Sequence, residues 1–202
     1  MIAIIDYDAG NLRSVEKALI SLGSDVVVTR ERSVINNASK IILPGVGAFG
    51  DCMDKLGNFD LIEVIKNNID AGKPFLGICL GLQLLYEGSD ESEGVTGLSV
   101  LKGRIKRIPN KDGFKIPHMG WNSLDIKEGA SLFKGIDNGT YVYFVHSYYL
   151  EAPERDTVAA TCEYSVRIDA SVEKDNVFAC QFHPEKSGDL GLKILNNFAE
   201  LR

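Results

Sequence analysis

The most informative segment of the sequence reads Phe75-Leu76-Gly77-Ile78-Cys79-Leu80-Gly81-Leu82-Gln83. The apolar residues at its start are typical of a buried strand. The residues that follow Cys79, as far as position 86, predict a helix. A cysteine with a glycine two positions away on either side, at a strand-to-helix turn, has the pattern of a nucleophile elbow. The turn is tight, so both flanking positions must lack bulk. The thiol of Cys79 would project at the helix N-terminus, where the dipole and free N–H groups favour the reactive thiolate. A buried cysteine in a glycine-containing turn is the structural alternative.

Strand and helix signals alternate on the N-terminal side of this stretch. Apolar runs predict strands at residues 2–6, 25–29 and 40–43, in addition to 73–78. Residues 11–22 carry apolar side chains at helical spacing, and Gly23 ends that helix. Residues 49–72 have room for one or two more helices. Continuous apolar strands separated by helices indicate a parallel sheet with helices on both faces.

The second half of the chain has a different character. Strands are predicted at residues 97–108, 121–126, 141–150, 157–163 and 177–182, joined by Gly, Pro and Asp turns. A final helix is predicted at residues 190–201. We therefore expect an α/β fold: an open, mostly parallel twisted sheet with helices on both faces and a mixed or antiparallel extension in the C-terminal half. Ligands of such sheets bind at the carboxyl ends of the strands.

Composition narrows the classes of function. The chain has 202 residues, with 22 Lys and Arg against 28 Asp and Glu, a formal charge of −6. This balance argues against a nucleic-acid binder, which needs clustered cations to contact phosphates. No apolar run approaches the roughly 20 residues that cross a bilayer, and the first residues carry no basic leader. We expect a single cytoplasmic domain over residues 1–202, without a membrane partner.

The four cysteines and one basic stretch complete the survey. Without a Cys-x-x-Cys spacing the cysteines predict no metal site, and those other than Cys79 are expected to be small buried apolar residues. Residues 102–107 hold four cations among six residues. They form either a solvated strand edge or a docking patch for an acidic partner, and the sequence leaves both open.

A cysteine nucleophile needs a base, and the base needs an orienting group. His183 follows the predicted strand 177–182 directly, and Pro184 pushes it towards an extended conformation. Glu185 can fold back to accept the imidazole N–H, so the two predict a base and its orienting carboxylate. His146 competes for the role of base without a neighbouring carboxylate, while His118 lies in a turn-rich stretch and is not expected to be a base.

A strand also runs into the turn Pro44-Gly45-Val46-Gly47. Two glycines let the backbone direct N–H groups outward, as acyl chemistry requires for the oxyanion of its tetrahedral intermediate. The residue after the nucleophile, Leu80, would supply a second N–H donor. The spacing excludes a dinucleotide-binding glycine motif.

In this combination and order, the turn at residues 44–47, the elbow at 77–83 and His183-Pro184-Glu185 resemble the class I (triad) glutamine amidotransferases over the whole chain. Residues 6–12, 44–49, 117–122 and 182–187 are similar in particular to the branch of this family that serves histidine biosynthesis. The resemblance implies hydrolysis of L-glutamine without a cofactor. It also implies transfer of the ammonia to a separate (β/α)8-barrel cyclase subunit in a heterodimer.

The resemblance also implies a role for each matching residue. Cys79 would attack the substrate amide, and His183, held by Glu185, would protonate the leaving ammonia. The residues implied to bind glutamine are Gly45, Gln83, Glu91 and Ser147, and those implied to donate to the oxyanion are Leu80 and either Val46 or Gly47. In the family, the turn at residues 44–47 is thought to direct its N–H groups productively only when the cyclase holds its substrate.

The segment 117–122 is expected to expose Met119 and Trp121 in a turn, facing the cyclase; burial in the core is the alternative.

Three other functions are alternatives to this one. A free-standing cysteine hydrolase would use the same triad without a partner. A degenerate regulatory subunit would commonly have lost the nucleophile, which this chain retains. A glutaminase of another pathway, such as anthranilate or pyridoxal phosphate synthesis, fits the segments at residues 44–49 and 120–122 less well.

Overall fold

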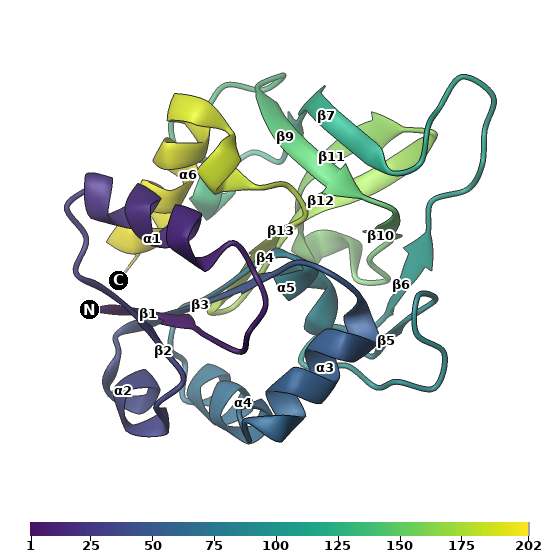
Figure 1. The fold of residues 1–202 in the computed structure, drawn as a ribbon. Coiled ribbons are helices and arrows are strands. Elements are labelled where there is room, and N and C mark those ends of the chain that lie inside the picture. The colour runs from purple at the N-terminus through teal and green to yellow at the C-terminus, as the bar shows by residue number, and fades with distance from the viewer. Residues whose placement is uncertain (202) are drawn as a thin grey trace.

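The computed structural model describes residues 1–201 and has an eight-stranded sheet at its centre (Figure 1). Arg202, the last residue of the expected domain, lies outside the described residues. Five neighbouring strands are parallel, in the order β2 (Val26–Thr29), β1 (Ile2–Ile5), β3 (Lys40–Gly45), β4 (Phe75–Cys79) and β13 (Val177–Cys180). The sheet continues through the antiparallel strands β12 (Val166–Lys174), β11 (Val158–Tyr164) and β8 (Asp125–Ile126).

Helices cover both faces of the sheet. One face carries α1 (Leu12–Ser21) and α6 (Gly188–Glu200), and the other carries α2 (Arg32–Asn37), α3 (Phe49–Asn58), α4 (Ile62–Asp70) and α5 (Leu80–Leu84). Residues 1–201 also form three short 3-10 helices, η1 (Ser131–Phe133), η2 (Arg155–Thr157) and η3 (Pro184–Lys186). The expected α/β class, with helices on both faces and an antiparallel extension, is confirmed.

Strand β3 shows why the strands of this sheet read as continuous apolar runs. Ile41 and Leu43 pack into the core beneath α3 and α4, whereas Ile42 packs into the core beneath α1 and α6. All three side chains are buried. A strand covered on both faces has no side that can carry polar residues.

Two smaller sheets lie beside the main one. A ribbon pairs β7 (His118–Ser123) with β9 (Tyr141–His146), and a three-stranded sheet has the order β10 (Tyr148–Leu150), β6 (Arg104–Arg107), β5 (Gly88–Ser89). The expectation of a turn at residues 117–122 is therefore wrong, since most of this segment is β7. Strand β6 covers only part of the predicted strand 97–108.

The basic stretch at residues 102–107 is not a strand edge, because β6 pairs with a neighbour on each side. Two of its cations are paired within the chain: Arg104 Nε lies 3.0 Å from Asp90 Oδ1, and Lys106 Nζ lies 2.5 Å from Glu151 Oε2. The stretch thus finds its acidic partners on this chain, which weakens its reading as a docking patch.

Several elements were not predicted from the sequence, namely strands β5 and β12, helix α2 and the three 3-10 helices. The segment that forms β12 does carry a signal, because apolar and polar residues alternate from Val166 to Val172. Helix α2 is six residues long and buries only Ile35, so it offers little periodicity to detect. Among residues 1–201, no helix is long and apolar enough to cross a membrane.

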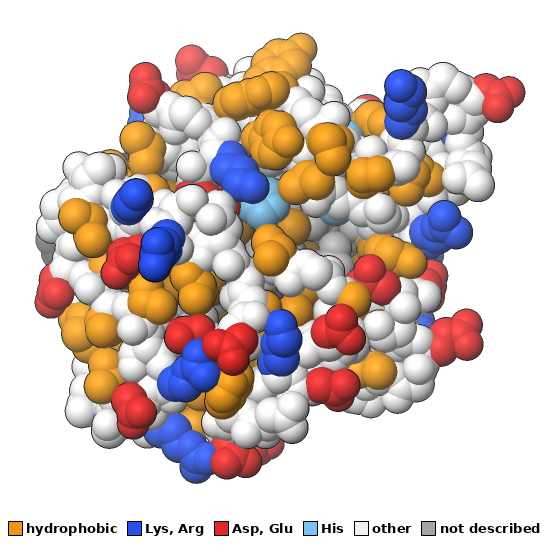
Figure 2. Space-filling model, viewed as in Figure 1, with side chains coloured by type: hydrophobic (Ala, Val, Ile, Leu, Met, Phe, Trp, Pro, Cys, Tyr) orange, Lys and Arg blue, Asp and Glu red, His pale blue; other side chains and the backbone are white. Residues whose placement is uncertain are grey.

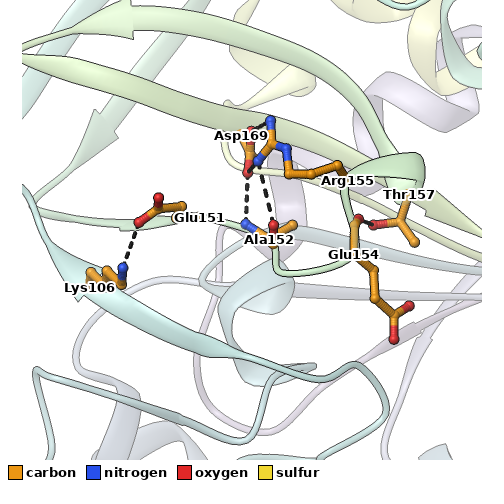
Figure 3. A network of polar contacts seen from close by, with 7 residues as sticks. All are labelled: Lys106, Glu151, Ala152, Glu154, Arg155, Thr157 and Asp169. Atoms are coloured by element: carbon orange, nitrogen blue, oxygen red, sulfur yellow. Dashed lines mark hydrogen bonds and ion pairs between the residues drawn. The ribbon is translucent and has the colours of Figure 1, made fainter.

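A polar network fastens the segment after β10 to β12 (Figure 3). The buried carboxylate of Asp169 on β12 accepts a hydrogen bond from the backbone N–H of Ala152 at 2.7 Å. Arg155 Nη2 donates to its other oxygen at 2.9 Å, and Nη1 also contacts the carboxylate. Lys174, at the end of the same strand, pairs with Glu154 at 2.6 Å, so two side chains of β12 hold the segment between β10 and β11.

Candidate active site

The turn after β3, the cysteine at the end of β4 and the histidine after β13 lie at the ends of three neighbouring parallel strands. Gly45 at the end of β3 is in register with Cys79 at the end of β4, and β13 pairs with the other side of β4 and leads to His183. Because the strands are parallel, their carboxyl ends lie at the same edge of the sheet. Cys79 and His183, which are 104 positions apart in the sequence, thus come to line the same cavity, as the fold class predicts.

The backbone at Cys79 has the geometry of an elbow. Its φ of 55° and ψ of −109° lie outside the regions that non-glycine residues prefer. A Cβ on Gly77 would lie 2.7 Å from the carbonyl oxygen of Gly81, and a Cβ on Gly81 would lie 1.9 Å from the carbonyl oxygen of Leu43. Both flanking positions therefore require glycine. Helix α5 ends at Leu84, two residues earlier than predicted, so it contributes less dipole to the thiol than a longer helix would.

His183 and Glu185 form a buried pair. His183 Nδ1 lies 2.9 Å from Glu185 Oε1, and each side chain is no more than 2% exposed. Burial lowers the pKa of His183, but its interactions with Cys79 and Glu185 outweigh burial and raise this pKa to about 9. His183 Nε2 has no hydrogen-bond partner among the described residues, so it is free to exchange a proton with a bound molecule.

The other two histidines form a neutral pair. His146 Nδ1 lies 2.8 Å from the carbonyl oxygen of Tyr148, which can only accept, so this nitrogen carries the proton. His146 Nε2 then accepts a hydrogen bond from His118 Nδ1 at 2.9 Å. Burial lowers the pKa of His146 to about 3 and that of His118 to about 4. Both ring nitrogens of His146 are thus occupied, which disfavours it as the base.

A cavity of about 310 Å³ opens beside the cysteine. It is lined by eight of the residues singled out from the sequence, namely Val46, Gly47, Cys79, Leu80, Gln83, Glu91, Ser147 and His183. Gly45 and Glu185 are not among its lining residues. Gly45 lies behind the wall, where a Cβ would come within 2.9 Å of Tyr7, Gly81 and Leu80. A larger cavity of about 670 Å³ between η1 and α6 has no cysteine or histidine among its described lining residues.

The turn after β3 is held by two residues that sequence reasoning missed. The hydroxyl of Tyr7 donates to the carbonyl oxygen of Pro44 at 2.8 Å, and Cys52 Sγ donates to the carbonyl oxygen of Val46 at 3.5 Å. Since the C=O and N–H of a trans peptide point in opposite directions, the N–H of Gly47 points away from Cys52. Gly47 has a φ of 101°, a conformation that favours glycine.

Two further residues of the site hold neighbouring backbone or side-chain groups. Glu91 Oε2 accepts a hydrogen bond from the N–H of Phe49 at the start of α3, at 2.8 Å. Asn11 Nδ2 donates to Glu185 Oε1 at 3.3 Å and so supports the carboxylate behind His183. Asn11 lies in the segment 6–12 that carries the family resemblance, but its spacing alone gives it no role.

An exposed apolar surface lies on the β7–β9 ribbon (Figure 2). Met119 is 62% exposed, Trp121 is 55% exposed and Tyr141 on β9 is 56% exposed. In Figure 2 hydrophobic side chains gather over the upper part of the molecule, where Figure 1 shows the ribbon. The core alternative for Met119 and Trp121 is wrong. Strand alternation explains it, because their neighbour His118 takes the buried face.

Among the described residues, no three His, Cys, Asp or Glu side chains come together in a way that could hold a metal ion. The arrangement around the cavity consists of a thiol, a carboxylate-supported imidazole and glycine-rich backbone. These groups suit acyl transfer through a covalent thioester.

Comparisons with known proteins agree on a family. Residues 3–201 match the family described as glutamine amidotransferase class-I. A protein of Caldanaerobacter subterraneus subsp. tengcongensis named imidazole glycerol phosphate synthase subunit HisH is 55% identical over 201 residues, 100% of this chain and 98% of that protein. A protein of the same name from Methanothermobacter thermautotrophicus is 52% identical over 201 residues, with the same coverage of each chain.

Solved structures share the fold. A crystal structure described as a glutamine amidotransferase superposes with a TM-score of 0.76 at 18% identity, covering 100% of both chains. The glutaminase domain of Trypanosoma brucei CTPS with bound acivicin superposes with a TM-score of 0.67 at 20% identity, covering 100% of this chain and 94% of that one. At these identities the likeness concerns the fold alone.

Proposed function

The chain belongs to the class I glutamine amidotransferase family, and from that premise we propose that it is the glutaminase subunit of imidazole glycerol phosphate synthase. In this role it hydrolyses L-glutamine and passes the ammonia to a (β/α)8-barrel cyclase subunit in histidine biosynthesis. It works as a single domain in a cytoplasmic heterodimer. Relatives about half identical over their full length carry this subunit's name, which supports the proposal.

The observation that carries the chemistry is the meeting of Cys79 with the His183–Glu185 pair beside one cavity. The elevated pKa of His183 keeps its imidazole protonated at neutral pH, and a protonated imidazole stabilises a neighbouring thiolate.

The reaction then follows in two balanced steps. Cys79 Sγ attacks the side-chain carbonyl carbon of glutamine, and the tetrahedral intermediate collapses as His183 Nε2 gives its proton to the leaving ammonia. A γ-glutamyl thioester remains. Water, deprotonated by His183, attacks this thioester and releases glutamate, and Sγ leaves as the thiolate. Glu185 keeps the imidazole oriented throughout.

The cavity wall supplies substrate contacts. The N–H of Leu80 and that of Val46 or Gly47 donate to the oxyanion. Both N–H groups of Gln83 are used within the protein, so its Oε1 is the atom left for a substrate donor. Glu91 pairs with the substrate ammonium, and Ser147 holds its amino-acid end by its backbone. Gly45 shapes the wall from behind, because a side chain there would collide with Leu80.

The exposed surface around Met119 and Trp121 is the docking face for the cyclase. Its strand, β7, begins at His118, whose ring contacts His146 in the cavity wall. The docking face and the cavity are thus two sides of one ribbon. This placement fits a short path for ammonia from the cavity to the partner.

The test is glutamate release from glutamine by the purified chain, alone and with a barrel cyclase subunit that carries its ribotide ligand. We expect a large rise only when both are added. High activity of the chain alone, unchanged by the cyclase, would leave the triad in place and favour a free-standing hydrolase or another pathway's glutaminase.

A further inference from the structure

Gln181 places a buried side-chain amide directly beside the nucleophile. It is the first residue after β13, and it is completely buried. Its Nε2 lies 3.7 Å from Cys79 Sγ, within hydrogen-bonding distance of a sulfur acceptor. A buried amide in a strand end that is otherwise apolar has an energetic cost unless its hydrogen bonds are made.

The orientation of this amide is fixed by a chain of hydrogen bonds that starts at a backbone carbonyl. Gln83 Nε2 donates to the carbonyl oxygen of Tyr148 at 3.1 Å and to Gln181 Oε1 at 2.9 Å. A carbonyl oxygen can only accept, so the amide of Gln83 cannot be turned round. Gln181 must therefore present its oxygen to Gln83 and its NH2 group to Cys79.

A donor at this position matters because the nucleophile is almost entirely buried: Cys79 is 7% exposed. A hydrogen bond to a charged acceptor is about twice as strong as one between neutral groups. In this setting an N–H aimed at sulfur favours the thiolate over the thiol.

We propose that Gln181 is a further catalytic residue, whose Nε2–H donates to Cys79 Sγ and stabilises the attacking thiolate, with Gln83 as the residue that positions this amide. The inference rests on the proposed function and deepens it. It gives Gln83 a second task besides its contact with the substrate. The thiolate of Cys79 is then stabilised by two groups, the charged imidazole of His183 and the neutral amide of Gln181.

The test measures the thiol without requiring the glutaminase reaction. Iodoacetamide alkylation of Cys79 is followed by mass spectrometry of its peptide, as a function of pH, in the chain alone and in its complex with the cyclase. Gln181→Met removes the donor at similar volume, and Gln181→Glu keeps an acceptor for Gln83 but places a carboxylate against sulfur. Asn68→Leu is the control, since it removes a buried amide on α4 whose hydrogen bonds run to Asn36, Val64 and Lys73.

We expect alkylation of Cys79 at pH 7 to fall about tenfold in Gln181→Met, and further in Gln181→Glu, as loss of a charge-assisted hydrogen bond implies. The pH of half-maximal alkylation should rise by about one unit. In the complex, kcat should fall while KM for glutamine changes little. Asn68→Leu should leave all three quantities unchanged.

Unchanged alkylation in a folded Gln181→Met variant would overturn the proposal, even if kcat fell. Should neither variant fold, the side-chain amide resonance of Gln181 in the 15N-labelled unmutated chain decides: it should shift with the same pH midpoint as alkylation, and a constant resonance would overturn the proposal. A chain that shows these alkylation effects but never releases glutamate would contradict the proposed function while leaving the Gln181 contact in place.

Discussion

At the scale of single residues, the positive φ of Cys79 costs about 1–3 kcal/mol in a non-glycine residue. The surroundings leave it no alternative, because Gly81 packs against the carbonyl of Leu43 without room for a methyl group. The close packing of α5 against β3 therefore stabilises the strained turn. In return the thiol meets the side chains of Gln181 and His183, which come from a distant part of the chain.

Replacing the nucleophile should separate the two halves of the proposed function. Cys79→Ser should abolish glutamine-dependent synthesis by the complex and leave ammonia-dependent synthesis intact, because only the thioester chemistry is lost. Product formation with each nitrogen source is the measurement. Cys162→Ser, at a buried cysteine away from the cavity, should change neither. Retained glutamine dependence in Cys79→Ser would assign the nucleophile elsewhere.

The neutral pair His118 and His146 should make the protein sensitive to mild acid. Their pKa values of about 4 and 3 lie below 6.5, so between these values the unfolded chain binds more protons than the folded one. Stability is therefore lost as pH falls below about 6.5, by about 2 kcal/mol per histidine at pH 5.

Urea unfolding at pH 7, 6 and 5 measures this effect. His146→Gln should show a smaller loss between pH 7 and 5 than the parent, even if it is less stable at pH 7. His183 contributes in the opposite sense: its raised pKa of about 9 gives stability that is full below pH 6.5 and lost as pH rises through 9. Equal acid losses in the parent and His146→Gln would show that the buried pair is not responsible.

At the scale of elements, the segment between β10 and β11 depends on the network in Figure 3. Asp169→Ala should lower the free energy of unfolding by about 2–3 kcal/mol, because it leaves the N–H of Ala152 and the guanidinium of Arg155 without their acceptor. Half of the Arg155 side chain is exposed, so water compensates part of the loss.

The matched control for this prediction is Glu151→Ala. It breaks the exposed pair with Lys106 in the same network and should cost less than about 0.5 kcal/mol. Urea unfolding of both variants at pH 7 gives the comparison. Similar losses in the two variants would mean that the burial of Asp169 does not matter.

At the scale of the whole molecule, the exposed apolar surface on the β7–β9 ribbon needs a partner. Trp121→Ala should weaken association with the cyclase by tenfold or more, as expected for a large aromatic residue at the centre of an interface. Isothermal titration calorimetry of the two subunits measures it. Ile20→Ala, at a similarly exposed apolar residue on α1, should not change the affinity. Unchanged binding of Trp121→Ala would remove the ribbon as the docking face.

Features that depend on near neighbours in the chain could be predicted from the sequence. The elbow at residues 77–81 and the His183–Glu185 pair each span a few residues, so local geometry decides them. The α/β class follows similarly from periodicity within single elements. Strand β12 has the same kind of local signal, because its apolar and polar residues alternate, although it was not among the predicted strands.

Contacts that join distant segments of the chain could not be predicted in this way and are seen in the folded structure. Gln83 and Gln181 are 98 positions apart, Glu91 and Phe49 are 42 apart, and His118 and His146 are 28 apart. The same residue types are common at ordinary surface and core positions, and the two members of each pair lie far apart in the sequence. No local pattern therefore predicts these contacts. The position of β6 between two strands and the formation of a strand at residues 118–123 also depend on pairing with distant segments. Strand pairing depends on which segments the rest of the chain brings together, and that is settled by packing of the whole core.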